Sequence, residues 1–315
     1  MLDHALKPSS LFASSALPRI VFVLGKGGVG RSTLSAALGL LCAQRDERTL
    51  IMQWTVADAI GPWFGAAPAG PTPTEIAPQL SVANFALDDA LRAYFVDHLH
   101  LGLVYRRVIR ARAVTRMIEV APGLAEMFFL GQLWWLITLA EREAGLCFDR
   151  VIVDAPATGH AASLLDIPSL ASAMAATSLL SVETRRVVDM LADPGRSGAV
   201  VVSLPEPLVV DETLELIPRV TARLGRAPLA LIVNRSANTI VGDDERPTWL
   251  DLLAAQLSES SRRAMVELHE ELRGRVVTEA ELRRRVACSA VSFAELPGQP
   301  PREIVRTASR VLEAA

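Results

Sequence analysis

The sequence predicts an α/β fold in which helices cover a parallel, doubly wound sheet, with further helical insertions. Short apolar runs typical of strands buried on both faces recur along the chain, and most are separated by helical patterns. One of these runs ends in a glycine-rich loop that leads into a helix. The chain has 315 residues, of which 50% are apolar and 21% charged, so it can bury a large core. A disordered or fibrous protein is therefore excluded.

The expected elements follow one another in a regular order. Residues 1–18 are rich in Ser, Ala and Pro and predict a flexible lead-in, followed by one domain over residues 19–315. A helix is expected over residues 33–44. Residues 86–146 lack a clear strand and predict a helical insertion, and residues 244–286 predict a solvated helical pair. Strands are expected at the apolar runs 20–24, 50–52, 80–85, 151–153, 199–204, 229–233 and 286–293.

Charge and cysteine content narrow the function classes. A net charge of −3 gives no basic surface for nucleic acid, so no nucleic-acid partner is expected. The three cysteines lie far apart in sequence, which favours a reducing, cytoplasmic compartment over a disulfide framework. The longest apolar stretch, residues 127–140, is shorter than the roughly 20 residues that a membrane helix requires. No integral membrane segment is therefore predicted.

The glycine-rich loop, residues 25–33 (GKGGVGRST), lies between an expected strand and an expected helix. Such a loop binds anions with backbone N–H groups and the positive end of the helix. The dinucleotide pattern G-x-G-x-x-G also fits, but it expects an acidic residue about 20 positions on, where this chain has residues 53–55 (QWT). The phosphate-loop pattern G-x-x-x-x-G-K-[ST] fits with Arg31 in place of lysine. We favour the phosphate loop, and a dinucleotide site and a plain structural turn are the alternatives.

The phosphate-loop interpretation gives a P-loop NTPase that binds ATP and Mg²⁺. Ser32 would place its hydroxyl on the metal. Asp154 ends an expected buried strand, the position from which an aspartate holds Mg²⁺ in such sheets. The residues expected to cradle the phosphates are Gly27, Gly28, Val29, Gly30, Arg31, Ser32 and Thr33.

Lys26 is one of only two lysines among the 32 basic residues, the other being Lys7. A lysine at the second position of a KGGVG[KR][ST] loop resembles the deviant Walker A class of dimeric P-loop ATPases. In that class this lysine reaches across a dimer interface to the partner's nucleotide. The resemblance therefore implies a catalytic role for Lys26 in a dimer, and an ordinary exposed lysine is the alternative.

A second string narrows the resemblance. Residues 154–168 (DAPATGHAASLLDIP) are similar to switch II of the ArsA/Get family of ATPases, in which a T-G-H element transmits the nucleotide state. Thr158, Gly159 and His160 occupy that element. Residues 231–235 (LIVNR) are similar to the family's string whose Asn binds adenine, which implies that Asn234 does so here. The resemblance covers roughly residues 19–312 and implies a cytoplasmic ATPase acting as a nucleotide-controlled homodimer, or as a heterodimer with an ArsA-like paralogue.

The sequence departs from the family at two catalytic positions. Arg31 replaces the lysine that bridges the phosphates, and Thr55 replaces the switch I aspartate that orients the attacking water. Asp58 lies three residues further on and is an alternative carboxylate. We therefore expect nucleotide binding with slow or absent intrinsic hydrolysis. The alternatives are a non-catalytic nucleotide-binding scaffold or regulatory subunit, and an NAD(P)-binding enzyme.

The helical insertion is the expected place of a partner. In the membrane-protein targeting members of the family, helices in this part of the chain line a groove for an apolar client. Met and aromatic residues also gather here, although such side chains at helical spacing more often form ordinary core. We expect a protein client or partner at this insertion, and a peripheral membrane partner is left open. The residues concerned are Met117, Met127, Phe128, Phe129, Trp134 and Trp135.

Overall fold

The computed structural model describes residues 11–55, 58–92, 123–155, 164, 180–238 and 257–315, and all structural statements concern these residues. Within them, eight strands form one sheet in the order β3-β4-β2-β5-β1-β6-β7-β8. Neighbouring strands are parallel, except that β3 and β4 are antiparallel. The predicted α/β fold with a doubly wound, mostly parallel sheet is thereby confirmed. The strands are β1 (Ile20–Leu24), β2 (Thr49–Gln53), β3 (Thr74–Ala77), β4 (Leu80–Asn84), β5 (Arg150–Asp154), β6 (Ser197–Ser203), β7 (Ala230–Ser236) and β8 (Ala290–Ala294).

The expected strands all form, and one more is added. β3 was not expected, because its sequence, TEIA, is short and largely exposed, so it carries no apolar run. It pairs with β4 across a tight turn in which Gln79 has a φ of 62°. β8 begins four residues later than the expected 286–293. The sequence thus finds the buried strands and misses the exposed edge strand.

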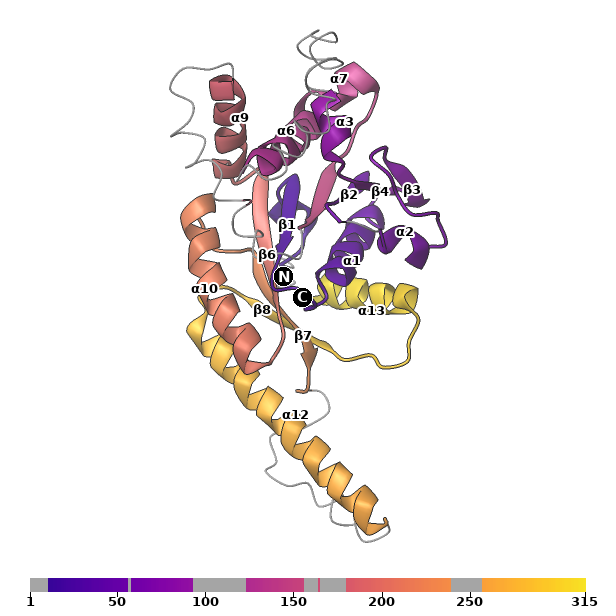
Figure 1. The fold of residues 1–315 in the computed structure, drawn as a ribbon, viewed down its shortest axis with the longest axis vertical. Coiled ribbons are helices and arrows are strands. Elements are labelled where there is room, and N and C mark those ends of the chain that lie inside the picture. Colours follow the sequence, from indigo (N-terminus) through magenta and orange to yellow (C-terminus); the bar gives the residue numbers. More distant parts are fainter. Residues whose placement is uncertain (1–10, 56–57, 93–122, 156–163, 165–179, 239–256) are drawn as a thin grey trace, which may run out of the picture.

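Helices cover both faces of the sheet (Figure 1). Alternate residues of β1 explain the two layers: Val21 and Val23 belong to the core under α1 and α13, whereas Ile20 and Phe22 belong to the core under α6 and α9. No described helix is both long and apolar enough to span a bilayer. The helices are α1 (Arg31–Ala43), α2 (Ile60–Trp63), α3 (Leu87–Arg92), α6 (Leu124–Thr138), α7 (Ala140–Ala144), α9 (Leu180–Ala192), α10 (Pro207–Leu224), α12 (Glu259–Arg285) and α13 (Pro301–Ala314).

Part of the expected flexible lead-in, residues 1–18, is packed against the domain. Phe12 is fully buried in the core, and Leu17 is nearly so. The guanidinium of Arg45 donates to the Phe12 carbonyl at 2.5 Å, and Arg150 donates to the Leu17 carbonyl. Residues 11–18 are therefore part of the folded domain, because their two apolar side chains are buried and their carbonyls are hydrogen-bonded.

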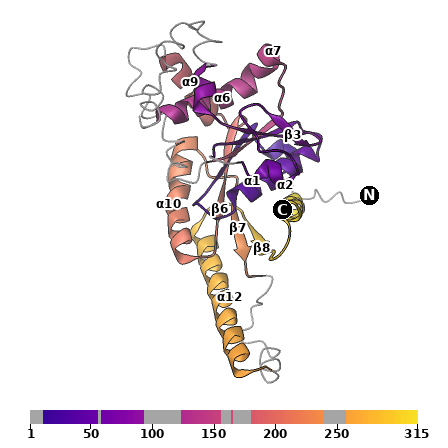
Figure 2. The same ribbon diagram turned by 45° about the vertical axis from the view of Figure 1, so that its right-hand side comes forward.

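Both segments that were expected to be helical contain helices in their described parts. The insertion over residues 86–146 contains α3, α6 and α7 in its described parts. The segment 244–286 contains one continuous helix, α12, in its described part. Residues 244–256 lie outside the described residues, so the expected pair of helices stays a prediction. Ser258 caps α12 by accepting from the Ser261 N–H at 3.3 Å. Figures 1 and 2 show α12 extending away from the sheet, beyond its contacts with α10 and β7.

Candidate nucleotide and metal site

The loop between β1 and α1 requires glycine at two of its turns. Gly25 has a φ of 152°, and a Cβ there would come within 2.3 Å of the Val202 carbonyl oxygen. Gly30 has a φ of 97°, and a Cβ there would come within 2.3 Å of the Asn234 Nδ2. Gly30 is also the N-cap of α1, and no side chain caps this helix start. The loop thus brings a helix start, which favours an anion, to the carboxyl edge of the sheet.

Ser32 and Asp154, 122 residues apart in sequence, meet beside this loop. The Ser32 hydroxyl donates to Asp154 Oδ2 at 2.7 Å, and the Ser35 hydroxyl donates to Oδ1 at 3.2 Å. Asp154 is 6% exposed. Burial raises the pKa of Asp154, while hydrogen bonds from Ser32, Ser35 and Gln53 and the charge of Arg31 oppose that rise. The ionised form of this buried carboxylate is therefore disfavoured by burial, despite these favourable contacts.

Arg31, at the position of the usual loop lysine, lies within this cluster. It is 7% exposed, and burial lowers the pKa of its guanidinium against the raising effect of Asp154. A guanidinium is larger than an ammonium group and has a fixed planar geometry. Arg31 therefore supplies the positive charge of the usual lysine with a different shape.

Asn234 joins the end of β7 to the loop. Its Nδ2 donates to the Val29 carbonyl at 2.9 Å, and its Oδ1 accepts from the Arg235 N–H at 3.0 Å. Arg235 has a φ of 53°, in the left-handed region, at the point where the pairing of β7 with β8 shifts register. The structure thus brings Asn234 to the loop between β1 and α1.

Thr55 and Asp58 occupy different environments. The amide of Asn84 holds the Thr55 backbone, because its Oδ1 accepts from the Thr55 N–H and its Nδ2 donates to the Thr55 carbonyl. The buried Asp58 carboxylate accepts the backbone N–H groups of Ile60, Gly61 and Ala69 at 2.7–3.2 Å. Both oxygens of Asp58 are therefore hydrogen-bonded within its own loop.

Lys26 lies at the surface of the loop. Its Nζ is 2.6 Å from Glu212 Oε1 in α10, and the two side chains are 37% and 52% exposed. The lysine is therefore held by its own chain in an accessible position.

The core of the insertion contacts the segment after β2. Trp54, Phe85 and Phe129 form an aromatic cluster with ring centroids 5.0–5.3 Å apart. Phe129 is fully buried, which supports ordinary core for this side chain, and Met127, Phe128, Trp134 and Trp135 are partly buried against the same core. Met117 lies outside the described residues, as do Thr158, Gly159 and His160 of the expected switch II.

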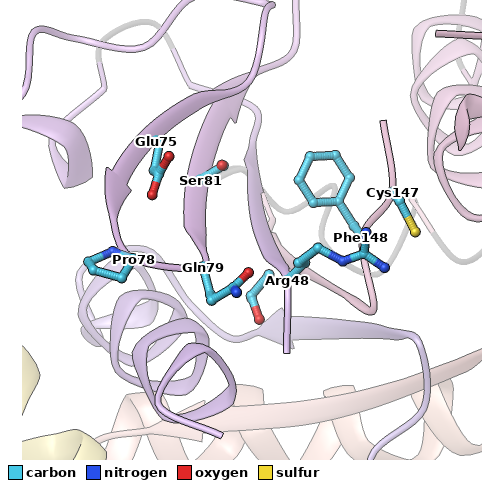
Figure 3. A pocket seen from close by; sticks show the side chains of 8 residues that line it. Arg48, Glu75, Pro78, Gln79, Ser81, Cys147 and Phe148 are labelled. Carbon is cyan, nitrogen blue, oxygen red and sulfur yellow. The ribbon is translucent and has the colours of Figure 1, made fainter. Parts of the chain in front are cut away.

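A surface pocket lies at the other end of the strands from the glycine-rich loop (Figure 3). It is lined by residues at the start of β2, in the turn between β3 and β4 and just before β5, including Arg48, Gln79 and Cys147. Since parallel strands point the same way, this pocket is remote from the loop. No group of three or more His, Cys, Asp or Glu side chains that could hold a metal occurs among the described residues.

The sequence predicted Ser32, Asp154 and Asn234 but missed four partners. Ser35 lies one helical turn after Ser32, so the spacing could have indicated it. Gln53 and Asn84 end neighbouring parallel strands, which places their side chains at the edge where ligands bind. Glu212 gives no signal in sequence, because its pairing with Lys26 depends on the packing of α10.

Comparison with known proteins gives a consistent result. The profile of the family described as anion-transporting ATPase matches residues 18–182. The "ATPase BagA" of Mycobacterium tuberculosis is 29% identical over 223 residues, which cover 69% of this chain and 65% of that protein. The "ATPase ASNA1 homolog" of Entamoeba histolytica is 31% identical over 179 residues (54% and 50%), and the "Arsenical pump-driving ATPase" of Escherichia coli is 25% identical over 290 residues (82% and 45%). The chain thus spans less than two thirds of the length of these relatives.

Proposed function

We propose, from the premise that the chain belongs to the anion-transporting ATPase family, that it binds Mg-ATP at the loop between β1 and α1. One observation carries this proposal: the Ser32 hydroxyl lies 2.7 Å from the buried Asp154 carboxylate at the carboxyl edge of the sheet. In phosphate-loop enzymes these are the residue types that hold Mg²⁺. A dinucleotide site is not favoured, because β2 ends in the uncharged Gln53 where such a site expects an acid.

The residues present fit a magnesium ion. Mg²⁺ prefers oxygen ligands and is usually held by one or two carboxylates together with substrate phosphates and water. Ser32 and Asp154 supply a hydroxyl and a carboxylate, and burial of Asp154 makes a bound cation favourable. When bound, the ion would neutralise charge on the phosphates. The loop backbone and Arg31 would bind the phosphates, and Asn234 would bind the base.

We infer that intrinsic hydrolysis is slow. Arg31 changes the geometry of the positive charge at the phosphates, and positioning is most of phosphoryl-transfer catalysis. Thr55 offers no carboxylate, and the Asp58 carboxylate accepts backbone N–H groups of its own loop. No described side chain is therefore placed as a clear substitute for the missing aspartate.

Measurement of Mg-ATP binding and hydrolysis tests this proposal. We expect calorimetry to detect Mg-ATP but not NAD⁺, and we expect Arg31→Lys with Thr55→Asp to increase the hydrolysis rate. Equal rates in the wild type and the double variant would contradict the impaired site. Binding without hydrolysis in both would favour a nucleotide-binding scaffold, and binding of NAD⁺ alone would contradict the whole proposal.

The protein is further proposed to act as a nucleotide-controlled dimer in the cytoplasm, with itself or with an ArsA-like paralogue. The exposed Lys26 supports this, since a lysine at this loop position is available to a second subunit. Light scattering with ADP, and with a non-hydrolysable ATP analogue, should show a dimer only with the latter. Lys26→Ala should abolish this nucleotide-dependent dimerisation, and Lys7→Ala, the control, should retain it. A monomer under all conditions, including with a co-expressed paralogue, would contradict dimerisation.

The helical insertion is the proposed output of the nucleotide state. Trp54 directly follows Gln53 at the site and packs against Phe129 of α6, which provides a physical connection. Mg-ATP is therefore expected to change the fluorescence of Trp54, relative to a Trp54→Phe control. A protein client or partner would bind at the insertion. Co-purification in ATP and in ADP should recover different proteins, whereas identical recovery would contradict a nucleotide-controlled partner.

A further inference from the structure

We propose that Asn234 is a positioning residue of the phosphate loop. Its amide fixes the peptide group between Val29 and Gly30, so that the Gly30 N–H is directed toward a bound phosphate. This inference rests on the proposed function, namely that the loop between β1 and α1 binds the phosphates of a nucleotide. It gives Asn234 a role in addition to the proposed contact with the base.

Asn234 reaches the loop from a strand that is not the neighbour of β1. In the sheet, β6 lies between β1 and β7. The loop packs against the end of β6, because a Cβ at Gly25 would overlap the Val202 carbonyl oxygen. A Cβ at Gly30 would in the same way overlap Asn234 Nδ2. Glycine at this second position therefore permits the amide to touch the loop backbone.

The orientation of the amide is set by its two hydrogen bonds. Asn234 Oδ1 accepts from the Arg235 N–H at 3.0 Å, so the nitrogen is the atom that faces the loop. Asn234 Nδ2 donates to the Val29 carbonyl at 2.9 Å. Val29 is only 1% exposed, and a buried carbonyl that lost its donor would be unfavourable. The Asn234 amide therefore holds this carbonyl in place.

The fixed carbonyl also fixes the N–H of the same peptide group. In a trans peptide the C=O and N–H bonds point in opposite directions, so the Gly30 N–H is directed away from Asn234. Among the residues that the structure describes, this N–H donates to no protein acceptor. Gly30 is also the N-cap of α1, where backbone N–H groups and the helix dipole favour an anion. The Gly30 N–H is therefore available to a phosphate oxygen.

The two roles of Asn234 make different demands on a ligand. An amide nitrogen carries two hydrogens and an amide oxygen accepts two hydrogen bonds, so the contacts with Val29 and Arg235 leave capacity for a base. A contact with the base acts only on ligands that have one. Positioning of the Val29–Gly30 peptide acts on every ligand with a phosphate chain, including tripolyphosphate, which has no base.

The first test measures the Gly30 N–H directly in the full chain. Labelling with carbonyl-¹³C valine and ¹⁵N glycine selects the Val-Gly peptides, of which the sequence has two, 29–30 and 241–242, and Gly242→Ala identifies the second. We expect saturating Mg-ATP to shift the Gly30 amide resonance in the wild type. This measurement does not depend on a variant at Asn234, and an unshifted resonance in an ATP-bound wild type would overturn the inference.

The second test compares ligands with and without a base by calorimetry. Asn234→Leu keeps the shape of the side chain and removes the donor to Val29 without adding a charge. We expect this variant to bind Mg-tripolyphosphate about tenfold more weakly than the wild type, and Mg-ATP at least tenfold more weakly. The Gly30 resonance shift should also decrease at saturating Mg-ATP. Asn238→Leu, at an exposed position of the same segment, is the matched control and should behave as the wild type.

The outcomes separate this inference from the proposed function. Weaker binding of Mg-ATP with unchanged binding of tripolyphosphate and an unchanged Gly30 shift would leave Asn234 as a base contact alone and would contradict positioning. Equal losses in Asn234→Leu and Asn238→Leu would also contradict it. A wild type that binds neither Mg-ATP nor tripolyphosphate would contradict the proposed function itself.

Discussion

Buried charged groups have different surroundings at the two ends of the parallel strands, which we call the amino edge and the carboxyl edge of the sheet. At the amino edge, Arg150 pairs with Glu47 at 2.7 Å and also donates to the carbonyls of Ser14 and Leu17. Arg19 donates to two further carbonyls there, at 2.7 and 2.8 Å. At the carboxyl edge, the buried Asp154 accepts from the hydroxyls of Ser32 and Ser35 with Arg31 nearby, and burial still raises its pKa.

This difference indicates that the amino edge contributes to stability, whereas the carboxyl edge is the proposed ligand site. Charges at the amino edge have protein partners on several sides, so they stabilise the fold and connect the lead-in to the sheet. At the carboxyl edge, burial raises the pKa of Asp154, which disfavours its ionised form, and we propose that a bound cation would favour that form. Four predictions test this contrast, ordered from the largest expected effect to the smallest.

Arg150→Ala should destabilise the fold most. It removes one partner of an ion pair whose side chains are only 11% and 12% exposed, which typically costs about 3–5 kcal/mol. Nucleotide affinity should be unchanged at temperatures where the variant is folded. Urea denaturation measures the free energy of unfolding. Arg48→Ala, which removes an exposed pair with Asp149, is the control and should leave the free energy of unfolding nearly unchanged. Equal losses in both variants would remove the distinction.

Asp154→Asn should weaken the binding of Mg-nucleotide rather than lower the free energy of unfolding. Loss of the carboxylate is expected to weaken Mg-nucleotide binding by about 100-fold, which corresponds to roughly 2.7 kcal/mol. Since burial raises the pKa of Asp154, the ionised form is disfavoured in the folded state, and the variant should be at least as stable as the wild type at neutral pH. Calorimetry and urea denaturation measure the two effects. Asp149→Asn, at the other end of the same strand, should leave nucleotide affinity unchanged; equal losses would refute the assignment.

Acidification should weaken the amino edge through Glu47. Burial alone would raise the pKa of this carboxyl, but hydrogen bonds from Arg150 and Ser14 outweigh it and lower the pKa. A lowered folded-state pKa gives stability that is present above the unfolded-state pKa of about 4.5 and is lost as the pH falls through the folded value. Glu47→Gln should cost about 1–2 kcal/mol at neutral pH and flatten the loss below pH 4.5. An unaltered acid profile would contradict this.

Glu212→Gln should have the smallest effect on stability. The pair with Lys26 is exposed, and such pairs contribute about 0–1 kcal/mol. Thermal unfolding should therefore be nearly unchanged, and nucleotide-dependent dimerisation should be retained or enhanced, because Lys26 is released. A large loss of stability would show that this contact is structural rather than available to a partner.

Much of the fold was predictable from sequence, because its signals are local. The apolar runs of β1, β2 and β5 identify buried parallel strands, and the glycines of the loop identify the turn between β1 and α1. β3 was not predicted, because an exposed edge strand has no such apolar run. The helical character of the charged segment before β8 was also predictable, and its described part is the helix α12.

The sequence by itself predicted the glycine-rich turn between β1 and α1 and the buried strands, and it indicated Ser32, Asp154 and Asn234 as candidate site residues. The turn and the strands give local signals, because glycines permit positive φ angles and buried strands are continuous apolar runs. Only the tertiary structure decided that Asp58 closes its own loop and that Gln53 lies against Asp154. Such contacts depend on which side chains packing brings together, and Gln53 and Asp154 belong to strands that are far apart in sequence and adjacent only in the folded sheet.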